Sequence, residues 1–476
     1  MRGVQLAGLT GGTPAGVDAA YGVVAGFDDA LLQGLGRLDS ARTSALADLA
    51  GAVAATPLGP RVAEAVEKIT AGSLGDGSLA LLAGARSALM GAVHDALLAQ
   101  LDSAQGRERR PWPAPAVASS VAAEGTPSPS ADGPLAGARS WLTEAAITGW
   151  RGVDGDALAA GRQLVPGLLA IASGRRLAVL LDGLVAELHA VSPIATADRV
   201  PVRRWGDLWS RAMLLARPDN GTAGTTGERV SGRLLILGVD VHEHPTAVQA
   251  QVHAVLEPGG GAPSRLVRTA VAAAKVDTIV GPTLWQLLRD YPVLLAALAS
   301  GVGIEVTDLV LRPGGDLLWQ EGGSRPDAPA DPFAVAGVQL DGVLADAAPP
   351  LHRHPAAIAE PVLLEDYTTS TDPEGTVTFH VDGAAIGVTV DRLPTCGPLT
   401  PELVAASCAC IGLLRWDADR WLVQPLAIRA TSKRKSTVVQ TGDWAMGTDG
   451  PRAAKMAKAG DAVSVLRERA GRLLRR

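Results

Sequence analysis

The chain has 476 residues, a formal net charge of −6 and 47% hydrophobic residues. That length exceeds what one hydrophobic core usually serves, so we expect several domains, and the composition is that of a folded chain rather than a disordered one. The small negative charge excludes binding of a polyanion through bulk charge alone, and 3 cysteines do not make the disulfide framework of a secreted protein.

Composition and the N-terminus lead us to expect a soluble bacterial protein of the cytoplasm. Arginine is strongly preferred to lysine, which is typical of GC-rich bacterial genomes. The opening residues MRGVQLAGLTGGTPAG lack the continuous apolar run of a signal peptide. The most apolar stretches, Leu164 to Leu188 and Val293 to Val306, are respectively interrupted by arginines and too short to cross a bilayer, so we expect no membrane insertion.

Residues 1–103 are predicted to form an N-terminal helical domain. Apolar residues recur there at spacings of three and four, which is the period of an amphipathic helix. Asp39 and Pro60 are typical helix starts, and the glycines from Gly72 to Gly77 predict a break.

A linker and a second helical module follow. Residues 104–133 are rich in Pro, Ser and Ala, so they are predicted to be a disordered linker that lets the first domain move. Residues 134–216 are predicted to be helical. At the end of this module Trp205 and Trp209 fall on one apolar face, with Asp207 expected on the solvent side.

The turn-rich segment 217–227 marks a change from helical to alternating periodicity. We expect two strand-rich units, at residues 228–322 and 333–450, and Asp382-Gly383 between alternating runs predicts a hairpin. The fold class is therefore α+β and multi-domain, with helical modules followed by a mainly antiparallel β region. The predicted strands include Leu234–Val241, Val248–Leu256, Leu266–Thr278, Ile304–Leu311, Asp316–Gln320, Val335–Leu340, Thr376–Asp382, Ala384–Val390 and Trp421–Arg429.

The two strand-rich units share a sequence pattern. Gly281-Pro282 and Gly397-Pro398 each precede a helix-like segment, a strand and a Trp-bearing turn. This pattern predicts two related units, each a small sheet or barrel with a helix. In the second copy, Thr400 before Pro401 is a good N-cap for a helix that we expect to continue through Cys408 and Cys410. Those two thiols would then point to different faces and act as small apolar residues, as would Cys396.

One stretch suggests metal chemistry. An apolar strand ends in Asp240-Val-His242-Glu-His244, which resembles the first-strand metal motif of the amidohydrolase superfamily. The resemblance implies a divalent metal bound by His242 and His244 that activates water for hydrolysis. The alternating strand that follows favours an antiparallel hairpin instead. A second pair, His352 and His354, would complete a four-histidine site if the two pairs met in space.

Basic residues near the C-terminus suggest a second alternative. Residues 451–476 are predicted to form a basic helix, and Lys433, Arg434 and Lys435 form a cationic run with Trp444 nearby. Together they predict a surface for single-stranded nucleic acid, although ordinary solvated charge is the favoured interpretation.

No stretch carries a complete catalytic constellation: phosphate-binding loop, nucleophile elbow and paired carboxylates are all missing from the pattern. We therefore lean away from an enzyme and expect no cofactor. The favoured hypothesis is a non-enzymatic binding or scaffold subunit of a bacterial multi-protein system, with protein partners. A metal-dependent hydrolase and a single-stranded nucleic-acid binder remain the alternatives.

Overall fold

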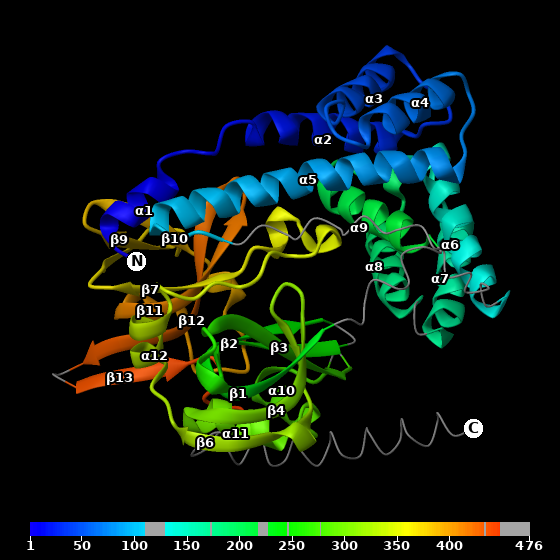
Figure 1. Ribbon diagram of the computed structural model, residues 1–476. Coiled ribbons are helices and arrows are strands. Elements are labelled where there is room, and N and C mark those ends of the chain that lie inside the picture. Colours follow the sequence, from blue (N-terminus) through cyan, green and yellow to red (C-terminus); the bar gives the residue numbers. More distant parts are fainter. Residues whose placement is uncertain are drawn as a thin grey trace.

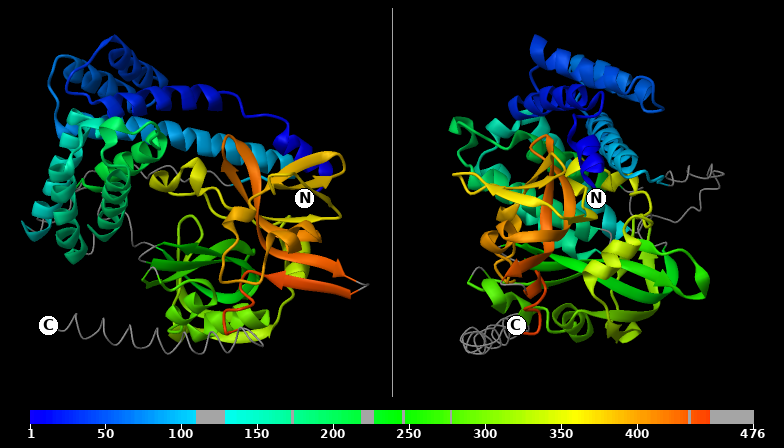
Figure 2. Two further views of the ribbon diagram at one scale, coloured as in Figure 1. Left: turned by 180° about the vertical axis from the view of Figure 1, so that it is seen from behind. Right: turned by 90° about the vertical axis from the view of Figure 1, so that its left-hand side faces the viewer.

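A computed structural model describes residues 1–109, 129–171, 174–217, 227–244, 247–276, 278–432 and 435–447. The first half of the chain is helical and the second half forms two sheets, so the predicted α+β class is confirmed. Most helices of the first half gather at one end of the molecule and the sheets lie at the other (Figures 1 and 2). No described helix is both long enough and apolar enough to cross a membrane.

The helices on the two sides of the predicted linker share one hydrophobic core. That core joins Phe27 and Leu82 to Leu142, Leu181 and Trp209, so the two predicted helical modules are not separate cores. The helices are α1 Gly3–Thr10, α2 Val17–Gln33, α3 Ser40–Ala52, α4 Gly59–Thr70, α5 Asp76–Gln105, α6 Pro129–Thr148, α7 Gly155–Ala170, α8 Arg175–Ala190 and α9 Val202–Leu215. As predicted, the Asp39 side chain caps α3.

Both predicted ends of the linker, residues 104 and 133, fall inside helices. Helix α5 continues to Gln105, and α6 begins at Pro129, before the expected boundary. Of the predicted linker, residues 110–128 lie outside the described part of the chain, as does the predicted basic helix 451–476.

Helix α5 connects the helical half to the second sheet. Its first part contributes Leu79 and Leu82 to the helical core, while Met90 and Leu97 pack with Phe379 of the second sheet. In Figure 1, α5 accordingly runs from the helical end to the strands. Helix α2 also contributes to both cores, with Phe27 in the helical core and Val24 beside the second sheet, so both helices join the two halves.

The first sheet contains β1 to β6. Strand β1 pairs with β2 and also with β4, β2 pairs with β3, and β3 runs parallel to β5, which pairs with β4. Helical segments α10 Leu284–Leu287 and α11 Pro292–Ser300 precede the fourth strand. The strands are β1 Glu228–Glu243, β2 Ala247–Pro258, β3 Arg265–Ala274, β4 Val302–Arg312, β5 Asp316–Leu318 and β6 Ser324–Pro329.

The second sheet repeats this pairing order. Its first strand is split, so that β8 pairs with β9 while β7 pairs with β11; β9 pairs with β10, and β10 runs parallel to β12, which pairs with β11. Helix α13 Pro401–Ala405 precedes β11 as α11 precedes β4. The strands are β7 Glu360–Glu365, β8 Thr368–Thr371, β9 Val377–Val381, β10 Ala384–Val388, β11 Ser407–Asp417, β12 Arg420–Ser432 and β13 Lys435–Gln440.

Two predicted elements in this half are wrong. The segment Val335–Leu340 belongs to helix α12 Pro332–Gln339, because the Asp331 side chain caps it and Pro332 begins it. The helix after Thr400 stops at Ala405, and strand β11 carries Cys408 and Cys410, of which Cys410 is buried. The Thr400 cap and the Asp382-Gly383 hairpin are confirmed.

The two sheets pack against each other through a small hydrophobic cluster. Leu235, Leu237 and Val255 of the first sheet meet Leu363 and Ile411 of the second, with Phe333 of α12 completing the cluster. The strands approach so closely that a Cβ at Gly238 would lie 2.6 Å from the Leu426 Cβ. Any larger residue at position 238 would push the two units apart.

Candidate functional site

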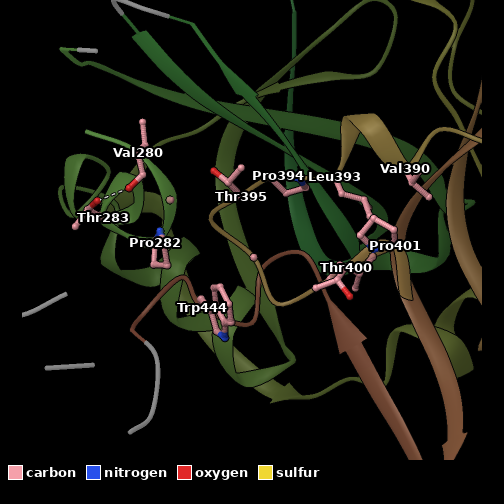
Figure 3. Close-up of a pocket in the computed structure, with 13 residues that line it drawn as sticks. Val280, Pro282, Thr283, Val390, Leu393, Pro394, Thr395, Thr400, Pro401 and Trp444 are labelled. Atoms are coloured by element: carbon pink, nitrogen blue, oxygen red, sulfur yellow. Dashed lines mark hydrogen bonds between the residues drawn. The ribbon is translucent and has the colours of Figure 1, made fainter. Parts of the chain in front are cut away.

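The repeated Gly-Pro segments meet at an apolar pocket of about 630 Å³. In Figure 3, Val280, Pro282 and Thr283 from the first unit lie opposite Leu393, Thr400 and Pro401 from the second, with Thr395 and Trp444 between them. The lining residues are Val280, Gly281, Pro282, Thr283, Val390, Leu393, Pro394, Thr395, Gly397, Leu399, Thr400, Pro401 and Trp444.

Local hydrogen bonds shape both walls of this junction pocket. Thr283 Oγ1 donates to the Val280 carbonyl at 2.6 Å, and the Trp285 indole N–H donates to the Cys396 carbonyl of the other unit at 2.9 Å. Thr400 caps α13 by accepting from the Leu403 N–H. The pocket is thus held by the turns that start the helices of both units.

The chemistry of the junction pocket is uncharged. Among the residues that the structure describes, its lining contains no acidic or basic side chain and no cysteine, and its polar side chains are threonines and one tryptophan. The neighbouring Cys396 thiol is buried, and burial raises its pKa to about 12, so it stays protonated at neutral pH. Such a site can hold an apolar group.

A buried polar network lies between the two units. Asp240 on β1 accepts from Arg415 Nη2 at 2.6 Å and from Gln424 Nε2 at 2.7 Å. Although burial alone would raise the Asp240 pKa, the hydrogen bond from His242 and the charge of Arg415 hold that pKa well below its usual range. The carboxylate therefore stays ionised and joins β1 to β11 and β12.

The histidines of the predicted metal motif do not meet the second histidine pair. His242 Nε2 lies 3.1 Å from Asp240 Oδ2, and His244 is exposed at the end of β1. His354 instead lies 2.9 Å from Asp207 of α9. Among the described residues, no three or more His, Cys, Asp or Glu side chains are grouped to hold a metal ion. A metal role for His242 and His244 therefore stays a prediction.

The structure describes two of the four residues of the nucleic-acid hypothesis, Lys435 and Trp444. Lys433 and Arg434 lie outside the described residues, and Lys435 begins β13. Trp444 lines the junction pocket. The other pocket residues were missed by sequence reasoning, although the repeated Gly-Pro pattern was the signal that could have found them.

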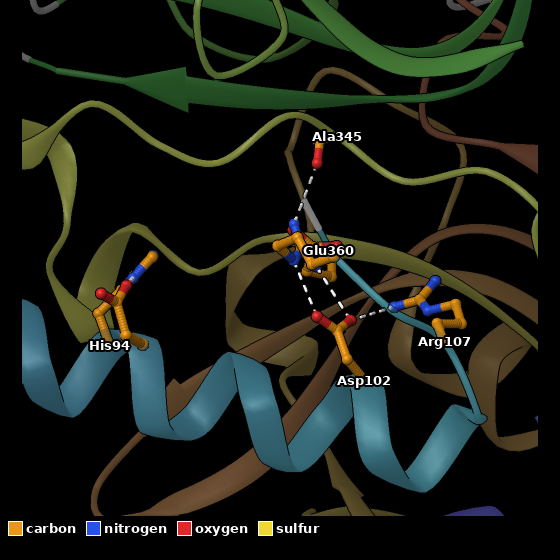
Figure 4. A network of polar contacts seen from close by, with 7 residues as sticks. His94, Asp102, Arg107, Ala345 and Glu360 are labelled. Atoms are coloured by element: carbon orange, nitrogen blue, oxygen red, sulfur yellow. Dashed lines mark hydrogen bonds and ion pairs between the residues drawn. The ribbon is translucent and has the colours of Figure 1, made fainter. Parts of the chain in front are cut away.

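A second polar network anchors α5 to the second sheet (Figure 4). Asp102 accepts from Arg109 Nε at 2.9 Å, and Arg109 Nη2 donates to Glu360 Oε2 at 3.0 Å. Arg107 also reaches Asp102, at 3.3 Å. Burial would raise the Glu360 pKa, but the Arg109 charge lowers it, so the pair remains ionised. This network holds the chain in place just before residue 110.

Burial of His253 predicts a measurable pH dependence of stability. Burial lowers its pKa to about 3 from 6.5, so below about pH 6.5 the unfolded chain gains a proton that the folded chain refuses. From about pH 7 to about pH 5 this group should reduce the free energy of unfolding by about 2 kcal/mol. In urea titrations across this range, His253→Gln should flatten the decline by that amount; parallel profiles for the two proteins would contradict the prediction.

Comparison with protein-family models, curated protein sequences and solved structures finds no match to this chain. Function is therefore inferred from the chemistry of the residues themselves.

Proposed function

We propose that this chain is a non-enzymatic binding subunit of a multi-protein assembly, and that the junction pocket receives an uncharged, apolar segment of a partner protein. The observation that carries the proposal is the pocket itself. Its volume of about 630 Å³ lies within the range of roughly 300–1,000 Å³ that is usual for ligand sites.

The absence of charge in the lining selects the kind of ligand. A carboxylate, phosphate or ammonium group placed in the junction pocket would lose water and gain no opposite charge from the lining residues that the structure describes. An aliphatic or aromatic side chain would bury apolar area against Leu393, Leu399 and Trp444 instead. This contrast favours an apolar ligand over a nucleic acid or an ionic metabolite.

Exposed apolar residues in the lining segments, or close to them in the sequence, favour a protein over a small molecule. Val280 at the mouth is 57% exposed, Val276 shortly before it is 48% exposed, and Met446 beside Trp444 is 61% exposed. A small ligand would fill the pocket and leave these three exposed side chains in water. A partner protein would cover both, as exposed apolar patches commonly require.

We further infer that each unit is a small closed barrel. The first strand pairs with the second and the fourth, and the third runs parallel to the fifth, which is the order of the oligonucleotide- and oligosaccharide-binding fold. This fold-level likeness supports a binding role in general. It does not select the ligand, because one fold hosts many functions.

Two matched valine substitutions test the proposal. Val280→Asp places a charge at the pocket mouth, whereas Val179→Asp places the same charge at a 68% exposed position on α8. Fluorescence titration with a neutral solvatochromic dye should show at least about tenfold weaker binding for Val280→Asp and unchanged binding for Val179→Asp. Equal binding by both variants would reject the pocket as an apolar site.

A shortened chain that ends at Gly447 tests whether residues 448–476 of the same chain occupy the junction pocket in place of a partner protein. If residues 448–476 occupied the pocket, their removal would increase the affinity for the dye. The proposal predicts the same affinity for the shortened and the full chain.

A further inference from the structure

A groove of about 580 Å³ lies between α4 and the first part of α5, at the helical end of the molecule (Figure 1). One wall follows the chain from Leu58 to Lys68, and the other follows α5 from Gly77 to Gly84. Each wall of this α4–α5 groove therefore extends over about two to three helical turns. The end of α9 contributes to the same groove, and no described residue lines both this groove and the junction pocket.

Three leucines form the apolar part of the α4–α5 groove. Leu58, Leu81 and Leu214 each pack against the helical core and remain only half-buried. A ligand that covers their remaining surface gains the free energy of apolar burial.

Gly84 leaves space beside these leucines. It lies inside the long helix α5, where glycine is less stable than alanine, and its φ is not positive. A Cβ at this position would lie 3.9 Å from the side chains of Leu58 and Leu214, which is ordinary van der Waals contact. Neither the backbone nor the packing of the described residues therefore requires glycine, and its missing side chain leaves room for a ligand.

The rim of the α4–α5 groove is positively charged. Its charged side chains among the described residues are the three cations Arg61, Lys68 and Arg217 and the single anion Glu64, a net charge of +2. Lys68 Nζ lies 2.7 Å from Glu64 Oε1, but these side chains are 56% and 63% exposed, so the pair is weak. Within the described ranges neither Arg61 nor Arg217 forms an ion pair.

We propose that the α4–α5 groove binds an acidic amphipathic helix of a partner protein. Residues seven apart lie on the same side of a helix, so Arg61 and Lys68 line one side of the groove two turns apart. Carboxylates at the same spacing on a bound helix would reach both cations, while its apolar face covers the three leucines. The space at Gly84 lets that helix approach closely.

Other occupants fit the α4–α5 groove less well. The chain's own residues 451–476 contain eight basic and two acidic side chains, so they would bring like charge to the rim. A nucleic acid would lack a stacking surface, because the described lining has no aromatic side chain.

Selection of displayed helical peptides on the immobilised full-length chain tests this proposal. Peptides that also bind the Gly84→Leu chain are removed first, because the larger side chain fills the space beside Leu58 and Leu214. We expect the remaining peptides to carry Asp or Glu at a seven-residue spacing beside an apolar face. Their binding should weaken as salt is added.

Charge reversal then identifies the cations that the peptides contact. Lys68→Glu should bind the remaining peptides at least about tenfold more weakly. Arg199→Glu is the matched control, at an exposed position before α9 and so at the other end of that helix from Arg217, and it should bind as the parent does. Gly84→Leu and Lys68→Glu should unfold at nearly the temperature of the parent. Val280→Asp should bind these peptides unchanged, which separates this groove from the junction pocket.

Three results would overturn the proposal. One is that no peptide remains after those that bind Gly84→Leu are removed. A second is that the remaining peptides lack acidic residues. The third is equal affinity of these peptides for Lys68→Glu and Arg199→Glu.

Discussion

Replacing Asp240 with alanine is expected to lower the free energy of unfolding by about 3 to 5 kcal/mol. The substitution leaves the Arg415 guanidinium and the Gln424 amide buried, with exposed fractions of 8% and 3%, and without their carboxylate partner. Because the network joins β1 to β11 and β12, the loss should also loosen the contact between the two units. Urea unfolding followed by tryptophan fluorescence measures the first effect.

A double variant distinguishes a lost partner from a general packing defect. Asp240→Leu combined with Arg415→Met replaces the ion pair by apolar groups of similar size, and such replacements are often neutral or stabilising. We expect the double variant to recover most of the stability lost in Asp240→Ala. A loss below about 1 kcal/mol in Asp240→Ala would contradict the importance of the network.

Arg86→Met is expected to have an effect of similar size in the helical half, about 3 to 5 kcal/mol. The Arg86 side chain is 1% exposed and donates to Asp28 at 2.6 and 2.7 Å and to Asp207 at 2.6 Å. Without this cation two carboxylates face each other in the core. The site is too tight to rearrange, since a Cβ at Gly206 would lie 2.4 Å from Asp28 Oδ1.

The exposed pair formed by Lys68 and Glu64 on α4 is the control for Arg86. Its side chains are 56% and 63% exposed, so Lys68→Ala should leave the unfolding midpoint nearly unchanged. A double-mutant cycle with Asp28→Asn then measures the coupling across the Arg86–Asp28 pair. Additive effects of the two substitutions would show that the pair does not act as a unit.

Periodicity predicted much of the fold, and its failures have local causes. The alternation of Val248 to Leu256 and the Asp382-Gly383 turn specified strands and a hairpin that the structure confirms. The alternating segment after Val335 is a helix, because the Asp331-Pro332 start outweighs the pattern. The short helix after Thr400 changes to strand at Ser407, where the continuous apolar run CACIGLL fits either structure.

Long-range contacts were the part that sequence patterns could not predict. The helical face with Trp205 and Trp209 was identified correctly, but Asp207 was expected in solvent and instead binds Arg86, which lies far away in the sequence. The core that the helices before residue 110 share with the helices after residue 128 was also missed, because its contacts join residues far apart in the sequence. The repeated Gly-Pro segments were recognised, yet only the packing of the two units shows that they form one pocket.

The most direct test of the junction pocket is a selection of random displayed peptides on the immobilised full-length chain. The enriched peptides should share an uncharged apolar run and bind the parent chain and Val179→Asp at least about tenfold more tightly than Val280→Asp. Enrichment of charged peptides, or equal binding to Val280→Asp, would contradict an apolar binding site between the two units.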